Sequence, residues 1–91
     1  MNESQIEILN NAIQTYGMDA QLDMCIEKMS ELTKEICKKK RGNNNRNKIA
    51  EEIADVEIML KQLKMMCNIS DDEVNNVILT KIHRLGERLK N

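Results

Sequence analysis

Two rows of carboxylates lie in the middle of the chain. In the first row, Glu27, Glu31 and Glu35 follow one another at four-residue steps. In the second row, Glu52 and Asp55 are three residues apart. On a helix, both spacings place the side chains on one side, where carboxylates repel one another unless a positive charge lies between them. Two such rows on neighbouring helices would form a group of oxygens suited to a hard divalent cation, above all Mg²⁺.

The same acids also fit a second interpretation, in which they lie on solvated helix faces. Rows of charge are common on exposed helices. Glu57 and Lys61 have the spacing of an ordinary i,i+4 ion pair, and the basic residues 38–41 are well placed near a helix C-terminus. Spacing alone therefore leaves both a metal site and solvated faces open.

The composition indicates one small helical domain. The chain has 91 residues, of which 41% are hydrophobic and 32% charged, with no proline and three glycines. This length suits one domain rather than two, and the scarcity of helix-breaking residues favours helices. A core of Leu, Ile, Val and seven methionines in so short a chain would be marginal alone. We therefore expect a homodimer or a homotetramer.

Charge and cysteine content narrow the expected partners and compartment. A net charge of −1 argues against binding of a nucleic acid polymer, which normally requires an excess of base. The three cysteines contain no CxxC pair, which favours reduced thiols in the cytoplasm. There is no leader pattern and no apolar run of roughly 18 residues, so no membrane association is expected.

Apolar spacing predicts four helices joined by short turns. The first is expected to start from a cap at Ser4 and to end at Gly17. The second is expected to start from a cap at Asp19 and to run to about Arg41. Gly42 can then adopt the left-handed conformation that ends a helix.

The third helix is expected from about Asn47 to Cys67, after the polar turn GNNNRN. It has apolar residues on two sides, so we expect it to be buried on both. The sequence SDDE at 70–73 fits a capping box that opens the fourth helix. Long helices with short connections favour an all-α, antiparallel four-helix bundle, completed by contact between subunits.

Three segments, in order, resemble the MazG-like all-α nucleotide pyrophosphohydrolases. They are IEKMSEL at 26–32, EEIADVEIMLKQL at 51–63 and KIHRLGERL at 81–89. The family has an EExxE motif on one helix and an ExxD motif on the next, and the ExxD segment is closely matched here. The resemblance extends from about Gln21 to the C-terminus. It implies a single MazG-like domain over residues 1–91.

The resemblance also implies an activity, the hydrolysis of a nucleoside triphosphate to the monophosphate and pyrophosphate with Mg²⁺ or Mn²⁺. Carried over by position, Glu31, Glu52 and Asp55 are the implied metal ligands and catalytic acids. The basic residues implied to contact substrate phosphates are Lys38, Lys39, Lys81, Arg84 and Arg88. Metal and basic groups would offset the charge of the polyphosphate while a water attacks phosphorus.

Lys28 departs from the family pattern, because it stands where the family has a metal-binding glutamate. An ammonium cannot ligate Mg²⁺ and repels it at short range. Glu27 or Glu35 would then replace the missing ligand, or the site would hold fewer metal ions. Alternatively, catalysis is weak or absent, Lys28 contacts a phosphate, and the domain sequesters nucleotides. A further alternative is a helical protein-interaction module whose acidic faces contact a basic partner.

Overall fold

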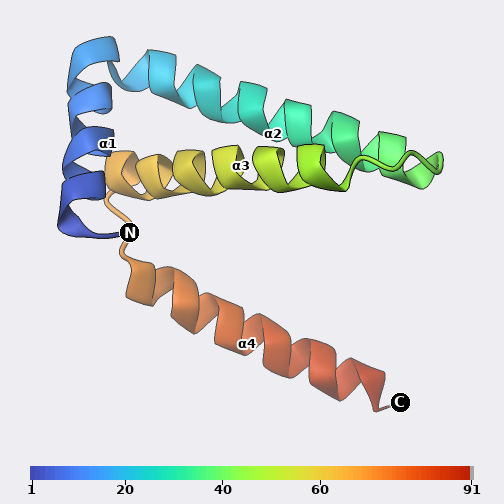
Figure 1. Cartoon of the computed structure of the whole chain (residues 1–91). Coiled ribbons are helices and arrows are strands. Elements are labelled where there is room, and N and C mark those ends of the chain that lie inside the picture. The colour runs from blue at the N-terminus through green and yellow to red at the C-terminus, as the bar shows by residue number, and fades with distance from the viewer. Residues whose placement is uncertain (91) are drawn as a thin grey trace.

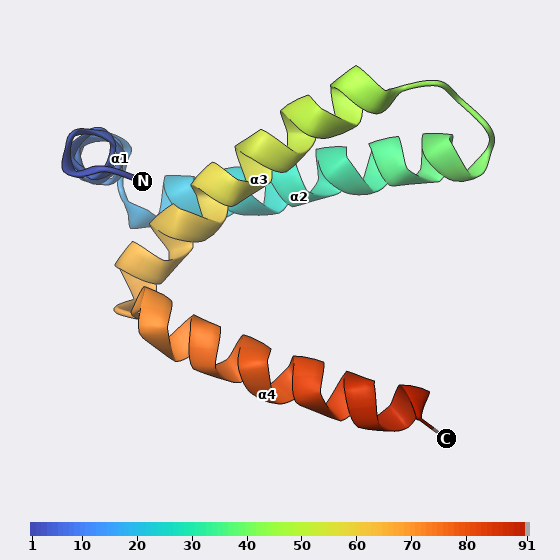
Figure 2. The same cartoon turned by 60° about the horizontal axis from the view of Figure 1, so that its bottom comes forward.

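The computed structural model describes residues 1–90, which form four helices and no strand. These are α1 (Glu3–Tyr16), α2 (Met18–Lys40), α3 (Arg46–Cys67) and α4 (Asp71–Leu89). Helices α2 and α3 form an antiparallel hairpin, and α1 crosses its open end (Figure 1). Helix α4 leaves this unit in a separate direction, as the second view confirms (Figure 2). The predicted all-α class is confirmed.

Capping boxes start the first and last helices. The Asn2 side chain accepts a hydrogen bond from the Gln5 backbone N–H at 2.8 Å, and the Gln5 side chain accepts one from the Asn2 N–H at 3.0 Å. The predicted cap at Ser4 is therefore wrong, since Asn2 satisfies these backbone groups two residues earlier. The predicted capping box of α4 is confirmed, with reciprocal bonds of 3.1 and 2.9 Å between Ser70 and Glu73.

Residues with positive φ mark the connections between helices. Gly17, with φ of 92°, turns the chain sharply between α1 and α2. The predicted cap at Asp19 is wrong, because α2 already begins after Gly17 and Asp19 lies in its first turn. Gly42 has φ of 89° just after α2, as predicted, and Asn68 ends α3 in the left-handed region.

A single chain buries almost no apolar side chain. Among residues 1–90, Cys25 is the one buried apolar residue, whereas Gln21, Glu35, Glu52 and Gln62 are buried polar residues. Many large apolar side chains are exposed in one chain; they include Ile8, Ile26, Met29, Ile36, Ile53, Leu60, Ile78, Ile82, Leu85 and Leu89. None of the four helices is both long and apolar enough to cross a membrane within the described chain.

The overall dimensions also show that a single chain is not compact. The radius of gyration is 16.0 Å, whereas a compact domain of this length has one of about 12 Å. The accessible surface is 7228 Å², against about 5,500 Å² for a compact protein of this mass. The predicted four-helix bundle is thus not closed within one chain, because α4 does not return onto the hairpin.

Helix α4 is attached to the end of α3 by ion pairs at the first residue of α4. The Asp71 carboxylate lies 2.7 Å from Lys64 Nζ and 3.1 Å from Lys61 Nζ. The predicted pair between Lys61 and Glu57 is wrong, since Lys61 reaches Asp71 instead. Val74 is half-buried, and every residue from 75 to 90 is exposed. Helix α4 is therefore held at its start and otherwise unsupported by its own chain.

Candidate metal centre

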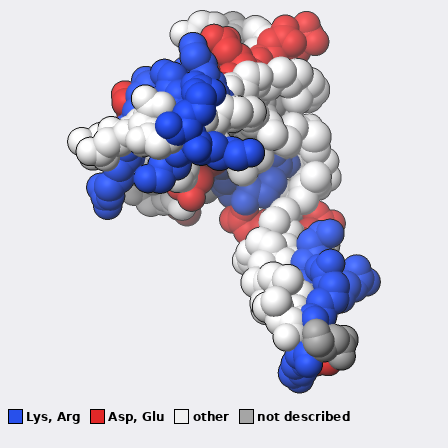
Figure 3. Space-filling view, turned by 90° about the vertical axis from the view of Figure 1, so that its right-hand side faces the viewer, with Lys and Arg blue, Asp and Glu red and all other residues white. Residues whose placement is uncertain are grey.

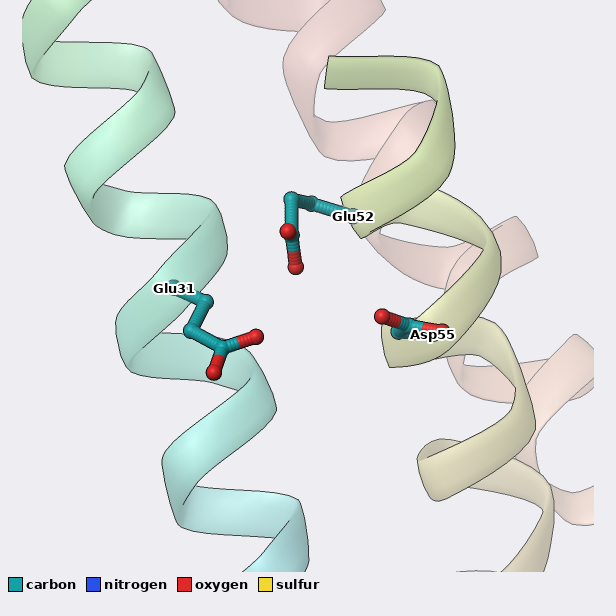
Figure 4. Close-up of side chains that lie close together, drawn as sticks. All are labelled: Glu31, Glu52 and Asp55. Atoms are coloured by element: carbon teal, nitrogen blue, oxygen red, sulfur yellow. The ribbon is translucent and has the colours of Figure 1, made fainter. Parts of the chain in front are cut away.

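Three carboxylates from α2 and α3 converge in the hairpin. Glu31 projects from α2, and Glu52 and Asp55 project from α3, with one oxygen of each within 4.8 Å of the others. Figure 4 shows the Glu52 carboxylate reaching into the space between Glu31 and Asp55. Oxygens on opposite sides of a bound Mg²⁺ are about 4.2 Å apart. A small side-chain movement would therefore let this carboxylate cluster hold one ion.

The local sequence explains this convergence. Residues three apart on a helix share a side, so Glu52 and Asp55 both lie on the α2-facing side of α3. The connection at residues 41–45 is short and turns the chain back, which brings the middle of α2 beside the start of α3. The antiparallel hairpin thereby adds Glu31 to the pair.

Glu52 is the most enclosed member of the cluster. Its side chain is 5% exposed, and its Oε1 lies 3.1 Å from Lys48 Nζ. Its Oε2 is buried and has no hydrogen-bond partner among the described residues. An unsatisfied carboxylate oxygen in a buried position is unfavourable. A cation bound to this oxygen would therefore stabilise the folded protein.

An ammonium group already lies beside the cluster. Lys28 Nζ is 3.5 Å from Glu31 Oε2, to which it donates, and 3.8 Å from Asp55 Oδ2. The pKa of Lys28 is raised, chiefly by the charge of Glu31 and further by that of Asp55, although loss of solvent acts in the opposite direction. Lys28 thus links α2 to α3 beside the three carboxylates.

Glu35 supports the turn and is not a member of the cluster. Asn45 Nδ2 donates to Glu35 Oε1 and to the Glu35 carbonyl oxygen, both at 3.0 Å, and Lys38 Nζ lies 3.3 Å from Oε2. The hydrogen bond from Asn45, assisted by Lys38, lowers the pKa of Glu35 despite its burial. Glu27 is exposed on α2 and also lies outside the cluster.

The candidate phosphate-binding residues occupy two other regions. Lys38 and Lys39 lie at the end of α2, where basic side chains gather around the tip of the hairpin (Figure 3). Lys81, Arg84 and Arg88 lie on α4, whose basic side is also visible in Figure 3. Because α4 extends away from the hairpin, one chain does not bring these last three residues to the carboxylate cluster.

Sequence reasoning missed two residues that shape the site. Lys48 is four residues before Glu52, a spacing that predicts an ion pair, and its bond to Glu52 raises the pKa of Lys48. Asn45 carried no such signal, since its bond to Glu35 spans ten residues and depends on how the turn folds. The pair between Lys48 and Glu52 could thus have been predicted from the sequence, whereas the bond between Asn45 and Glu35 could not.

Comparisons of the chain with protein-family models, with curated proteins and with solved structures gave no match. The resemblance to MazG-like proteins therefore rests on the three segments quoted above. The convergence of Glu31, Glu52 and Asp55 is a separate observation, made from the arrangement of α2 and α3.

Proposed function

We propose that this chain is a MazG-like nucleotide pyrophosphohydrolase that binds Mg²⁺ or Mn²⁺ at Glu31, Glu52 and Asp55. The observation that carries the proposal is the meeting of these three acids, with a buried and unpartnered oxygen on Glu52. They occupy the last position of EExxE and both acidic positions of ExxD in the resemblance. Their oxygens are the ligand type that Mg²⁺ and Mn²⁺ prefer.

The chemistry divides between the ion and the chain. A bound divalent cation would offset charge on the polyphosphate and acidify a water. The chain's own carboxylates hold the ion, and an oxygen of Glu31 or Asp55 left free of it can orient the water and accept its proton. Water adds to phosphorus, the phosphoanhydride bond breaks, and the monophosphate and pyrophosphate separate. The exposed basic residues supply positive charge to the substrate.

Pyrophosphate release from a panel of nucleoside and deoxynucleoside triphosphates with Mg²⁺ tests this function. We expect release from at least one substrate, and a loss of about 100-fold or more in Glu52→Gln and Asp55→Asn, because each variant removes a ligand charge. Glu57→Gln is the matched control, since Glu57 is exposed on the same helix and outside the cluster. Folded protein that releases no pyrophosphate from any substrate would refute the enzymatic function.

Lys28 favours one second candidate, a protein that binds nucleotides without cleaving them. Its ammonium lies at the carboxylate cluster, where a fourth carboxylate would strengthen metal binding. Calorimetry that shows nucleotide binding, together with no pyrophosphate release, would support sequestration. Gain of turnover in Lys28→Glu would show that this one residue separates the two functions.

We also propose that the working form is a homo-oligomer that completes the bundle. The accessible surface of 7228 Å² exceeds that of a compact chain by roughly 1,700 Å². Two chains would together hide an area within the range of obligate dimers, about 2,000–5,000 Å². The exposed apolar row of α4, which includes Ile78, Ile82 and Leu85, is the surface that we expect a partner to cover. A second copy supplies matching apolar rows on α2 and α3.

A further inference from the structure

Lys28 is placed as an internal cation for the carboxylate cluster. Its Nζ lies within 4 Å of oxygens on both Glu31 and Asp55, so it bridges α2 and α3. Its side chain is 28% exposed, which leaves a route for the ammonium to turn outward to solvent. A second ammonium, that of Lys48, pairs with Glu51 and with Glu52 of the cluster. The three carboxylates are thus flanked by two ammonium groups.

The position of Lys28 conflicts with a bound divalent cation. Mg²⁺ binds oxygen at about 2.1 Å, so an ion on Glu31 and Asp55 would lie close to an ammonium that uses the same two carboxylates. Like charges at such a distance repel strongly where water is partly excluded. Lys48 conflicts less, because it contacts Glu52 Oε1, while Oε2 is the buried oxygen without a partner.

We propose that Lys28 is a tethered counter-ion that joins Glu31 to Asp55 in the metal-free protein and must be displaced when a divalent cation binds. The inference rests on the proposed metal site at Glu31, Glu52 and Asp55. Lys28 therefore weakens metal binding, because the incoming ion replaces an attraction that already exists. It also stabilises the metal-free hairpin, because without it the carboxylates repel one another.

Substitutions at this residue separate charge from packing. Lys28→Met keeps an unbranched side chain and removes the charge, so we expect Mn²⁺ to bind about tenfold more tightly. Lys28→Arg keeps the charge and should retain the weak affinity. Lys34→Met is the matched control, because Lys34 is an exposed lysine on the same helix and takes no part in the cluster.

Titration of the full chain with Mn²⁺, followed by the electron paramagnetic resonance signal of the free ion, measures these affinities. Thermal unfolding adds a second readout. Without divalent ions, Lys28→Met should melt below the wild type, and the difference should shrink or reverse at saturating Mn²⁺. Adding Glu52→Gln to Lys28→Met should abolish the tight binding, which assigns it to this cluster.

The outcomes distinguish this inference from the function on which it rests. If the wild type binds Mn²⁺ through Glu52 and Lys28→Met binds no more tightly, the counter-ion role is refuted and the metal site stands. If neither protein binds Mn²⁺, the metal site and the counter-ion role both fail. Should Lys28→Met not fold, Lys28→Gln provides the neutral variant, and the same comparison with Lys28→Arg decides the result.

Discussion

The α2–α3 hairpin and α4 use opposite types of side chain. In the hairpin, the buried residues are mainly polar or charged; Glu35 is bonded to Asn45 in the turn, and Lys28 joins α2 to α3 through Asp55. In α4, an apolar row and a basic side both lie exposed, and the ion pairs that attach the helix to α3 are at its first residue. The hairpin therefore holds its buried polar groups within one chain, with one oxygen of Glu52 left without a partner. Helix α4, in contrast, exposes an apolar row that its own chain does not cover.

The two regions therefore depend on different interactions for their stability. Buried polar groups require specific partners, and the Glu35 carboxylate has them in Asn45 and Lys38, close to the turn of the hairpin. An apolar row requires only area, and a second copy can supply that area. Changes in α4 should therefore disturb assembly first, while changes in the hairpin should disturb local structure and metal binding.

The largest expected effect is on assembly, from Ile82→Glu. A charge in the middle of the apolar row of α4 should prevent its burial against a partner, at a loss of at least about 2 kcal/mol of association free energy. Sedimentation equilibrium should show a shift from oligomer to monomer, and the thermal midpoint should fall and become less dependent on protein concentration.

Asn76→Glu is the matched control for that change. Asn76 lies on α4 away from the apolar row and is exposed, so the same added charge should leave assembly intact. A wild-type protein that sediments as a monomer at all concentrations would contradict the proposed oligomer. If the Ile82→Glu variant remains an oligomer, the interface does not involve the apolar row of α4.

A smaller effect is expected at the turn of the hairpin, from Asn45→Ala. This change removes two hydrogen bonds to Glu35 and leaves its buried carboxylate with Lys38 alone. We expect the thermal midpoint to fall by about 5 °C, with little change in oligomeric state. Asn44→Ala is the control, because Asn44 is exposed in the same turn. Equal midpoints for the two variants would show that the Asn45 bonds do not stabilise the hairpin.

Much of the fold was predictable because its signals are local. Apolar periodicity gave four helices, and Gly17, Gly42 and the SDDE segment marked their limits. The predicted caps at Ser4 and Asp19 were wrong because both helices begin two residues earlier, at the N-caps Asn2 and Gly17. The direction of α4 was not predictable from the sequence, because the ion pairs that attach it to α3 join residues seven and ten apart and come from its first turn.

The candidate site was predictable to the extent that helix spacing and hairpin register agree. The pairing of Glu52 with Asp55 follows from their spacing, and Glu31 joins them because the turn sets the register. Glu35 belonged to the same predicted row as Glu31, but its carboxylate accepts a hydrogen bond from Asn45 in the turn and lies outside the cluster. Binding of Mg²⁺ and pyrophosphate release stay predictions, because spacing and register place ligands without identifying the substrate.

The smallest expected effect concerns the attachment of α4, tested by the pH dependence of Asp71→Asn. Bonds from Lys64 and then Lys61 lower the pKa of Asp71 below its ordinary value of 3.8. A carboxyl group with a lowered pKa stabilises the fold above its ordinary pKa and loses that contribution as the pH falls through the lowered pKa. Wild-type stability should therefore decrease on acidification below about pH 4, and Asp71→Asn should remove part of that decrease.

Thermal unfolding of both proteins from about pH 6 to about pH 2.5 measures this contribution. The wild type should be more stable than Asp71→Asn at the upper end, by a small amount because Asp71 is more than half exposed, and the two curves should converge at the lower end. Asp72→Asn is the control, since Asp72 is an acid in the same first turn and takes no part in the bonds to Lys61 and Lys64. Parallel curves for wild type and Asp71→Asn would show that the ion pairs do not stabilise the start of α4.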